Sequence, residues 1–127
     1  MNILTFDVLA SFTFAVLYGF MENRLFRILT FWKFKKESRE DGLIDHFKLY
    51  HVFMLFLFII AGRSSSLKIW IFNVFMMPMV EDAAWFLFEG RMPKPDDWTN
   101  WPIYKLILGL PYWYWIVGAI LALITIY

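Results

Sequence analysis

Residues 67–89, LKIWIFNVFMMPMVEDAAWFLFE, decide the fold of this chain. No charged residue lies between Lys68 and Glu81, and the side chains in that interval are mostly apolar. A helix of this length extends about 35 Å, which is enough to cross the hydrocarbon core of a bilayer. The stretch therefore predicts a transmembrane helix.

Three more apolar segments accompany this one, and hydrophobic residues make up 61% of the 127 residues. A water-soluble domain this small exposes much of its surface and could not bury so much apolar area. The sequence therefore predicts an all-α fold, an integral membrane four-helix bundle with short loops, as a single transmembrane domain over residues 1–127. The predicted spans are residues 3–22, 43–62, 67–89, and either 103–127 or 111–127.

The fourth segment has two interpretations. In one, a helix capped by Asn100 forms a single long span to the last residue. In the other, residues 101–110 lie at the membrane interface, because Lys105 would otherwise be immersed in lipid, and Pro111 starts a shorter span behind an aromatic belt. We favour the second interpretation.

The basic residues indicate how the bundle is oriented. All 12 Lys and Arg residues except Arg63 and Lys68 lie in residues 24–48 or 91–105. Because cytosolic loops carry the excess of Lys and Arg, both termini are expected on the non-cytosolic side of the cell membrane. The basic part of the loop at residues 33–41 is expected to contact anionic lipid headgroups. The first helix is also expected to continue as a basic interfacial helix. Its residues include Arg24, Arg27, Trp32 and Lys36.

Composition excludes several classes of function. The net charge is +1, and no Lys/Arg-rich groove with interleaved aromatic residues is present, so no nucleic-acid partner is expected. Cysteine is absent, which excludes disulfides, thiolate metal sites and cysteine nucleophiles.

Ionisable groups within the predicted spans mark a candidate site. Each costs about 2.5–3.5 kcal/mol at the centre of a membrane helix on insertion scales, so such groups are a functional-site hypothesis by default. They share the cytosolic half of the predicted bundle and come from three helices. They are Glu22, His46, His51, Glu81, Asp82 and Glu89.

Helical spacing predicts which of these side chains point inward. Residues 11, 15, 18 and 22 form one small and polar stripe on the first span, and Asp82, Trp85 and Glu89 form a stripe on the third. Glu81 points about 100° away from Asp82, so one acid of the pair is expected to face the bundle and the other a neighbour. His46 and His51 are five residues apart and do not share the four-residue spacing that lets two histidines bind one metal.

A proline adds a mechanical feature to the third span. Pro78 removes one backbone hydrogen bond and clashes with the carbonyl of Val74, which is expected to kink the helix three residues before Glu81. The stretch PMVEDAAWFLF, residues 78–88, resembles the proline–acidic-pair–aromatic motif of membrane lycopene cyclases over about a dozen residues. In that family one residue separates the proline from the acids, whereas two do here. The resemblance implies acid-catalysed isoprenoid chemistry without establishing family membership.

The first functional hypothesis is a metal-dependent or acid/base membrane enzyme that acts on a lipid or isoprenoid. Carboxylates and imidazoles from several helices are the usual ligands of zinc, iron or manganese in such bundles. The predicted catalytic residues are Glu81, Asp82 and His51. The predicted metal ligands are Glu22, His51, Glu81, Asp82, His46 and Glu89.

Two other classes of function remain open. The same groups could bind a cation or relay protons in a transporter, which would need an oligomer to complete a path. Alternatively, the chain is a non-catalytic accessory subunit of a larger membrane complex, and its buried acids form salt bridges.

Overall fold

The structure is a computed structural model that describes residues 6–24, 49–95, 103 and 105–127, with side chains from Val52 onward in the second of these ranges. Most of the described residues are helical. Four helices and one two-stranded antiparallel hairpin make up the described secondary structure. The elements are α1 (Phe6–Arg24), α3 (Leu49–Ala61), α4 (Leu67–Glu89), β1 (Leu106–Ile107), β2 (Leu110–Pro111) and α5 (Tyr112–Ile126).

The observed helices follow the predicted segments closely. α4 has the bounds predicted for the third span, and α5 agrees with the shorter version of the fourth. The longer version, a helix from residue 103, is wrong because the chain forms the hairpin before α5 begins. The basic extension beyond Arg24, the N-terminal part of the second span, and His46 lie outside the described residues.

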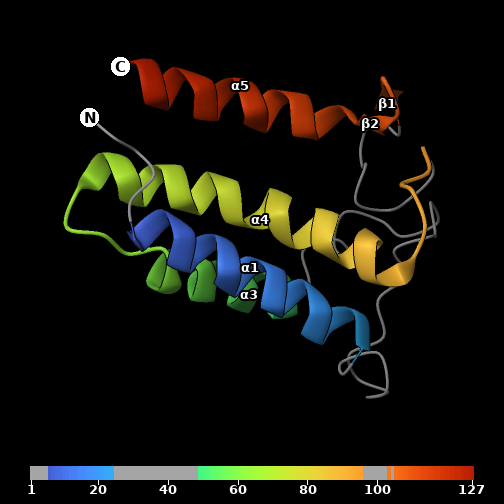
Figure 1. The fold of residues 1–127 in the computed structure, drawn as a ribbon, viewed down its shortest axis with the longest axis horizontal. Coiled ribbons are helices and arrows are strands. Elements are labelled where there is room, and N and C mark those ends of the chain that lie inside the picture. The colour runs from blue at the N-terminus through green and yellow to red at the C-terminus, as the bar shows by residue number, and fades with distance from the viewer. Residues whose placement is uncertain (1–5, 25–48, 96–102, 104) are drawn as a thin grey trace.

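α4 is the central helix, with α1 and α3 on one side and α5 on the other (Figure 1). α1 and α4 run in the same direction, and α3 and α5 run in the opposite one, so α1 begins and α5 ends at the same end of the molecule. The most extensive helix contact is between α1 and α4. Of the described helices, α4 alone is both long and apolar enough to cross a membrane.

The close contact between α1 and α4 depends on a glycine. A Cβ atom at Gly19 would lie 2.7 Å from the Glu81 carbonyl oxygen and 2.9 Å from the Ala84 Cβ. The predicted inward stripe of α1 is confirmed. Its buried residues are Val8, Ser11, Ala15, Tyr18, Gly19, Glu22 and Asn23.

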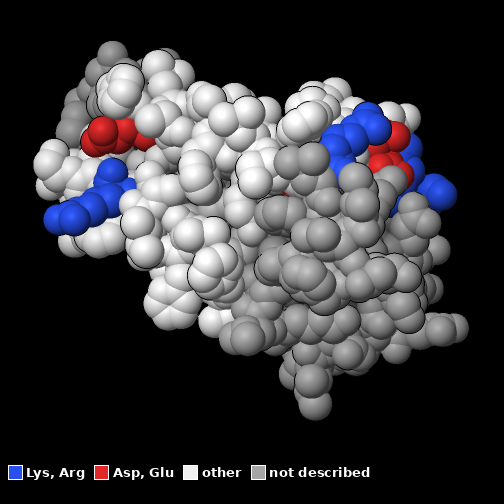
Figure 2. Space-filling model, turned by 90° about the horizontal axis from the view of Figure 1, so that it is seen from below, with Lys and Arg blue, Asp and Glu red and all other residues white. Residues whose placement is uncertain are grey.

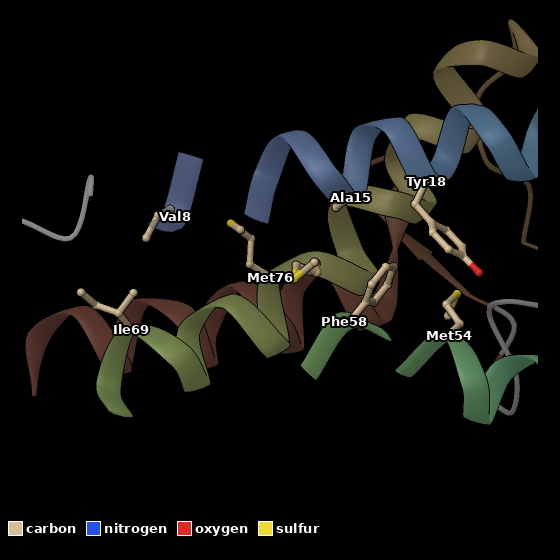
Figure 3. Close-up of a cluster of buried hydrophobic side chains, with 8 residues drawn as sticks. Val8, Ala15, Tyr18, Met54, Phe58, Ile69 and Met76 are labelled. Carbon is tan, nitrogen blue, oxygen red and sulfur yellow. The ribbon is translucent and has the colours of Figure 1, made fainter. Parts of the chain in front are cut away.

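Aromatic and sulfur side chains fill the space between α1, α3 and α4 (Figure 3). Phe58 of α3 is fully buried, and its ring packs edge-on against Tyr18 with centroids 5.3 Å apart. Met76 and Met77 of α4 belong to the same cluster. These methionines therefore pack in the core, as methionines in apolar helices usually do.

The turn between α3 and α4 is held by side-chain hydrogen bonds. Ser66 caps α4, because its hydroxyl accepts a bond from the Ile69 backbone N–H. The Ser64 hydroxyl donates to the Asp7 carboxylate at the start of α1. Asn73 donates to the Gly62 carbonyl oxygen at 2.9 Å. The turn thus connects three helices at this end of the bundle.

A tight hairpin positions the start of α5. Leu108 and Gly109 both have positive φ angles, 51° and 80°, as a type I′ turn requires. The hairpin pairs Leu106 with Pro111 and Ile107 with Leu110. The Trp115 indole N–H donates to the Ile107 carbonyl oxygen at 2.9 Å, which ties the first turn of α5 to the hairpin.

Candidate functional site

The two adjacent acids of α4 belong to residues that contact different helices. Both side chains are buried, with exposed fractions of 4% for Glu81 and 3% for Asp82. The backbone of Glu81 lies against Gly19 of α1. Asp82 instead accepts a hydrogen bond of 2.6 Å through Oδ2 from the Tyr114 hydroxyl of α5. Both acids are therefore buried inside the fold, and which of them faces the bundle and which a neighbour stays a prediction.

Tyr114 is a site residue that the sequence analysis did not identify. It lies 32 residues after Asp82, in an aromatic stretch that is typical of a membrane interface. No local spacing distinguishes it from its tyrosine and tryptophan neighbours. The contact exists because the hairpin turns α5 back along α4 and places its first turns beside Asp82.

A second polar group connects the C-terminal ends of α1 and α4. The Asn23 amide donates to the Glu89 carboxylate at 2.8 Å and to the Trp85 carbonyl oxygen at 3.2 Å. The Arg24 guanidinium donates to the Phe88 carbonyl oxygen at 2.7 Å. The end of an α-helix leaves several carbonyl groups without intrahelical partners, and these bonds satisfy such groups near the end of α4. This group, with Glu89 in it, therefore fastens two helix ends together.

A groove of about 420 Å³ opens between the end of α4 and the start of α5. Its lining is largely apolar, and within the described part of the chain Arg91 is its one charged residue. Tyr114 also lines the groove, so the hydroxyl partner of the buried Asp82 belongs to a residue of the groove wall. The lining residues are Ala83, Phe86, Leu87, Gly90, Arg91, Met92, Pro93, Leu110 and Tyr114.

The position of Arg91 follows from the end of α4. Gly90 adopts a left-handed conformation with a φ of 78°, and its N–H returns to the carbonyl oxygens of the last turn, which ends the helix. The Arg91 guanidinium then lies 4.9 Å from the centre of the Phe86 ring and 5.7 Å from that of Trp85. A guanidinium over an aromatic face is stabilised by the negative face of the ring.

The described residues do not assemble the predicted metal ligand set. Among them, no three His, Asp or Glu side chains lie close enough together to hold one metal ion. Glu89 bonds with Asn23 at the end of α1, whereas Asp82 bonds with α5. His46 lies outside the described residues, and His51 lies in α3 with its side chain outside the description.

No family model matches the chain, and comparison with curated proteins and with solved structures gives no significant match. The resemblance of residues 78–88 to the lycopene cyclase motif is therefore a local one.

Proposed function

We propose that this chain is an integral membrane protein whose four described helices lie in the bilayer. The supporting observation is that its polarity is reversed relative to a water-soluble protein. Ser11, Asn73 and the acids Glu22, Glu81 and Asp82 are buried, while large apolar side chains cover the outside of every helix. In water both features cost free energy, whereas in lipid the outer apolar surface is solvated by acyl chains.

The positions of the charged residues agree with this proposal. Figure 2 shows that the charged side chains of the described residues visible on one face gather at its two ends, and that the described residues between them are uncharged. On α4, Lys68 and Glu89 are about 31 Å apart along the axis, close to the thickness of about 30 Å of a hydrocarbon core. We assign the end with Arg91 and Lys94 to the cytosol because basic residues favour that side.

We propose further that the protein is an acid/base enzyme acting on a lipid or isoprenoid substrate held in the groove between α4 and α5. The observation that carries this proposal is the hydrogen bond from Tyr114 to Asp82. It joins a buried carboxylate to a residue that lines a largely apolar groove. In the proposed membrane location, a substrate can enter this groove from the lipid phase and from the membrane interface.

The bond direction defines a proton path. Asp82 accepts a proton from the Tyr114 hydroxyl as the tyrosine oxygen takes a proton from a carbon or hydroxyl of the substrate. The reverse transfer returns the proton to a neighbouring atom of the substrate, so the net reaction is an isomerisation without redox change. Glu81 adds a second buried acidic residue next to Asp82.

The experiment measures proton exchange directly. The purified protein is reconstituted with an isoprenoid-containing lipid extract in D₂O, and deuterium at carbon atoms of the lipids is quantified by mass spectrometry. We expect incorporation by the wild-type protein and a loss of at least about 100-fold in Asp82→Asn and in Tyr114→Phe. Tyr112→Phe, which changes a tyrosine that does not line the groove, should keep the activity.

Two outcomes would contradict the proposal. Incorporation that is equal in wild type, Asp82→Asn and Tyr114→Phe would show that the pair moves no substrate proton. The second outcome is a wild-type protein that contains a stoichiometric metal and loses both the metal and its activity in His51→Ala or Glu81→Ala. Recovery of activity on addition of zinc, iron or manganese would then favour the metal-dependent form of the enzyme.

A further inference from the structure

Two buried polar side chains of α1 and α4 each have an oxygen atom with no hydrogen-bond partner among the described residues. Ser11 of α1 is 1% exposed, Asn73 of α4 is fully buried, and the two atoms are Ser11 Oγ and Asn73 Oδ1. Burying a polar atom without a partner costs its full desolvation free energy. Neither residue belongs to the groove or to the pair of Asp82 and Tyr114, so the proposed enzyme does not account for them.

The two residues lie at the same level of the bundle. α1 and α4 run in the same direction, and Gly19 lies against the Glu81 carbonyl oxygen (Figure 1). Ser11 precedes Gly19 by eight residues, and Asn73 precedes Glu81 by eight residues, so each lies about 12 Å before that contact along its helix. Apolar residues that flank both positions belong to one buried cluster (Figure 3). They are Val8, Ala15, Ile69, Met76 and Met77.

The orientation of the Asn73 amide is fixed by its other half. Nδ2 donates to the Gly62 carbonyl oxygen, in the turn after α3. A carbonyl oxygen accepts only from a donor, so this bond identifies which amide atom is nitrogen and which is oxygen. Oδ1 points away from Nδ2 and carries no hydrogen, so it can only accept a hydrogen bond or bind a cation.

Asp7 adds a negative charge at this end of the bundle. It precedes Ser11 by four residues, which places the two on the same face of α1, and it is half-buried. Within the described part of the chain, the Ser64 hydroxyl is its one hydrogen-bond partner, and no ion pair neutralises it. Ser64 follows Gly62 by two residues, so the turn that holds Asn73 also holds Asp7.

Other charges at this end do not replace a partner for this group. Arg63 is exposed in the turn, and Lys68 is half-buried in the first turn of α4, but neither forms an ion pair with Asp7. The N-terminal end of α1 favours an acid in its first turn, which explains the carboxylate. It does not explain the unpartnered oxygen atoms of Ser11 and Asn73.

We propose that Asp7, Ser11 and Asn73 bind a monovalent hard cation, for which Na⁺ is the probe, where α1 and α4 begin. A carboxylate, a hydroxyl and an amide oxygen are the ligand types that hard cations prefer. One carboxylate balances one positive charge, which favours a monovalent ion over Ca²⁺. A buried water molecule would satisfy the two neutral oxygens but would leave the carboxylate without a counter-charge. This site is separate from the groove and does not depend on the proposed enzyme.

The test measures binding of radioactive Na⁺ to the detergent-solubilised full chain, with choline chloride holding the ionic strength constant. We expect saturable, equimolar binding that unlabelled NaCl displaces and CaCl₂ displaces no better. Asp7→Asn should weaken the affinity at least about tenfold, because the amide still accepts from Ser64 but carries no charge. Ser11→Ala should weaken it about fivefold, because one neutral ligand is lost.

Matched variants separate ion binding from folding. Thr13→Ala removes an exposed hydroxyl of α1 that bonds to the Leu9 carbonyl oxygen, and it should keep the affinity for Na⁺. In choline chloride without Na⁺, Ser11→Ala should unfold at the same temperature as the wild type or a higher one, because its hydroxyl has no described partner to lose. Weaker binding by Ser11→Ala then reports a lost ligand and not a damaged fold.

The inference is overturned if the wild type shows no saturable Na⁺ binding, which is the result expected of a buried water. Unchanged affinity in Asp7→Asn or in Ser11→Ala, or tighter binding of Ca²⁺ than of Na⁺, would also overturn it. The enzyme proposal fails or holds independently, because it is measured by deuterium incorporation. Asp82→Asn should lose that incorporation and bind Na⁺ as the wild type does.

Discussion

Gly19 lies at a close approach of the α1 and α4 backbones. Both helices contribute backbone atoms to this contact, because a Cβ at position 19 would meet the Glu81 carbonyl oxygen and lie 3.2 Å from the Trp85 backbone nitrogen. Backbone atoms cannot rotate away as a long side chain can. The backbone of α4 at Glu81 is therefore held close to α1 because residue 19 has no side chain.

At this residue scale, Gly19→Ala should destabilise the protein by about 1–3 kcal/mol, because the added methyl group forces the helices apart. Thermal unfolding of the detergent-solubilised protein measures the change. Gly118→Ala is the matched control, since a Cβ there would meet none of the described residues within 4 Å, and the better helix propensity of alanine favours the variant. Equal unfolding temperatures for the two variants would contradict this account of the contact.

At the scale of elements, the hairpin between α4 and α5 decides what Asp82 meets. It reverses the chain within six residues, and the Tyr112 N–H donates to the Lys105 carbonyl oxygen at 3.0 Å across its base. Leu108 stands in the left-handed region, which costs a non-glycine residue about 1–2 kcal/mol. The hairpin therefore holds an unfavourable residue in a turn that positions α5.

The turn responds to substitution in opposite directions. Leu108→Asn should stabilise the protein by about 1 kcal/mol, because asparagine adopts the left-handed region readily and Asn-Gly favours a type I′ turn. Leu108→Val should destabilise it, since a β-branched side chain tolerates this region poorly. Both substitutions are made at a position that is 87% exposed, so lost packing does not confuse the comparison. Unfolding that shifts in the same direction for both would refute the assignment.

At the scale of the whole molecule, the membrane location and orientation that we propose can be tested by labelling. The chain contains no cysteine, so single-cysteine variants can be labelled without a background signal. Ser65 lies in the exposed turn between α3 and α4, Lys94 is exposed after α4, and Phe75 faces outward from the middle of α4.

A membrane-impermeant maleimide should label Ser65→Cys in intact cells, and Lys94→Cys only after permeabilisation. Phe75→Cys should stay unlabelled in both conditions, because lipid surrounds it. Exchanged labelling of the first two variants would reverse the orientation that we assign. Labelling of all three in intact cells or in a soluble fraction would contradict the membrane location itself.

Local patterns in the sequence determined the helical segments and the inward face of α1. The bounds of α4 follow from the serine and glycine at its ends and from the apolar run between them. The buried stripe on α1 follows from small and polar residues that recur every three or four positions. These features depend on neighbours in the chain. They can therefore be predicted without knowing which helix packs against which.

The tertiary structure alone decided the partners of the buried groups. Tyr114 meets Asp82, and Gly19 meets Glu81, across separations that carry no local signal. The hairpin was also missed, because its Leu-Gly turn lacks the Asn-Gly or Asp-Gly signature of a type I′ turn. Helices that share an apolar exterior can pack in several ways, and the contacts between their small and polar residues select one of them.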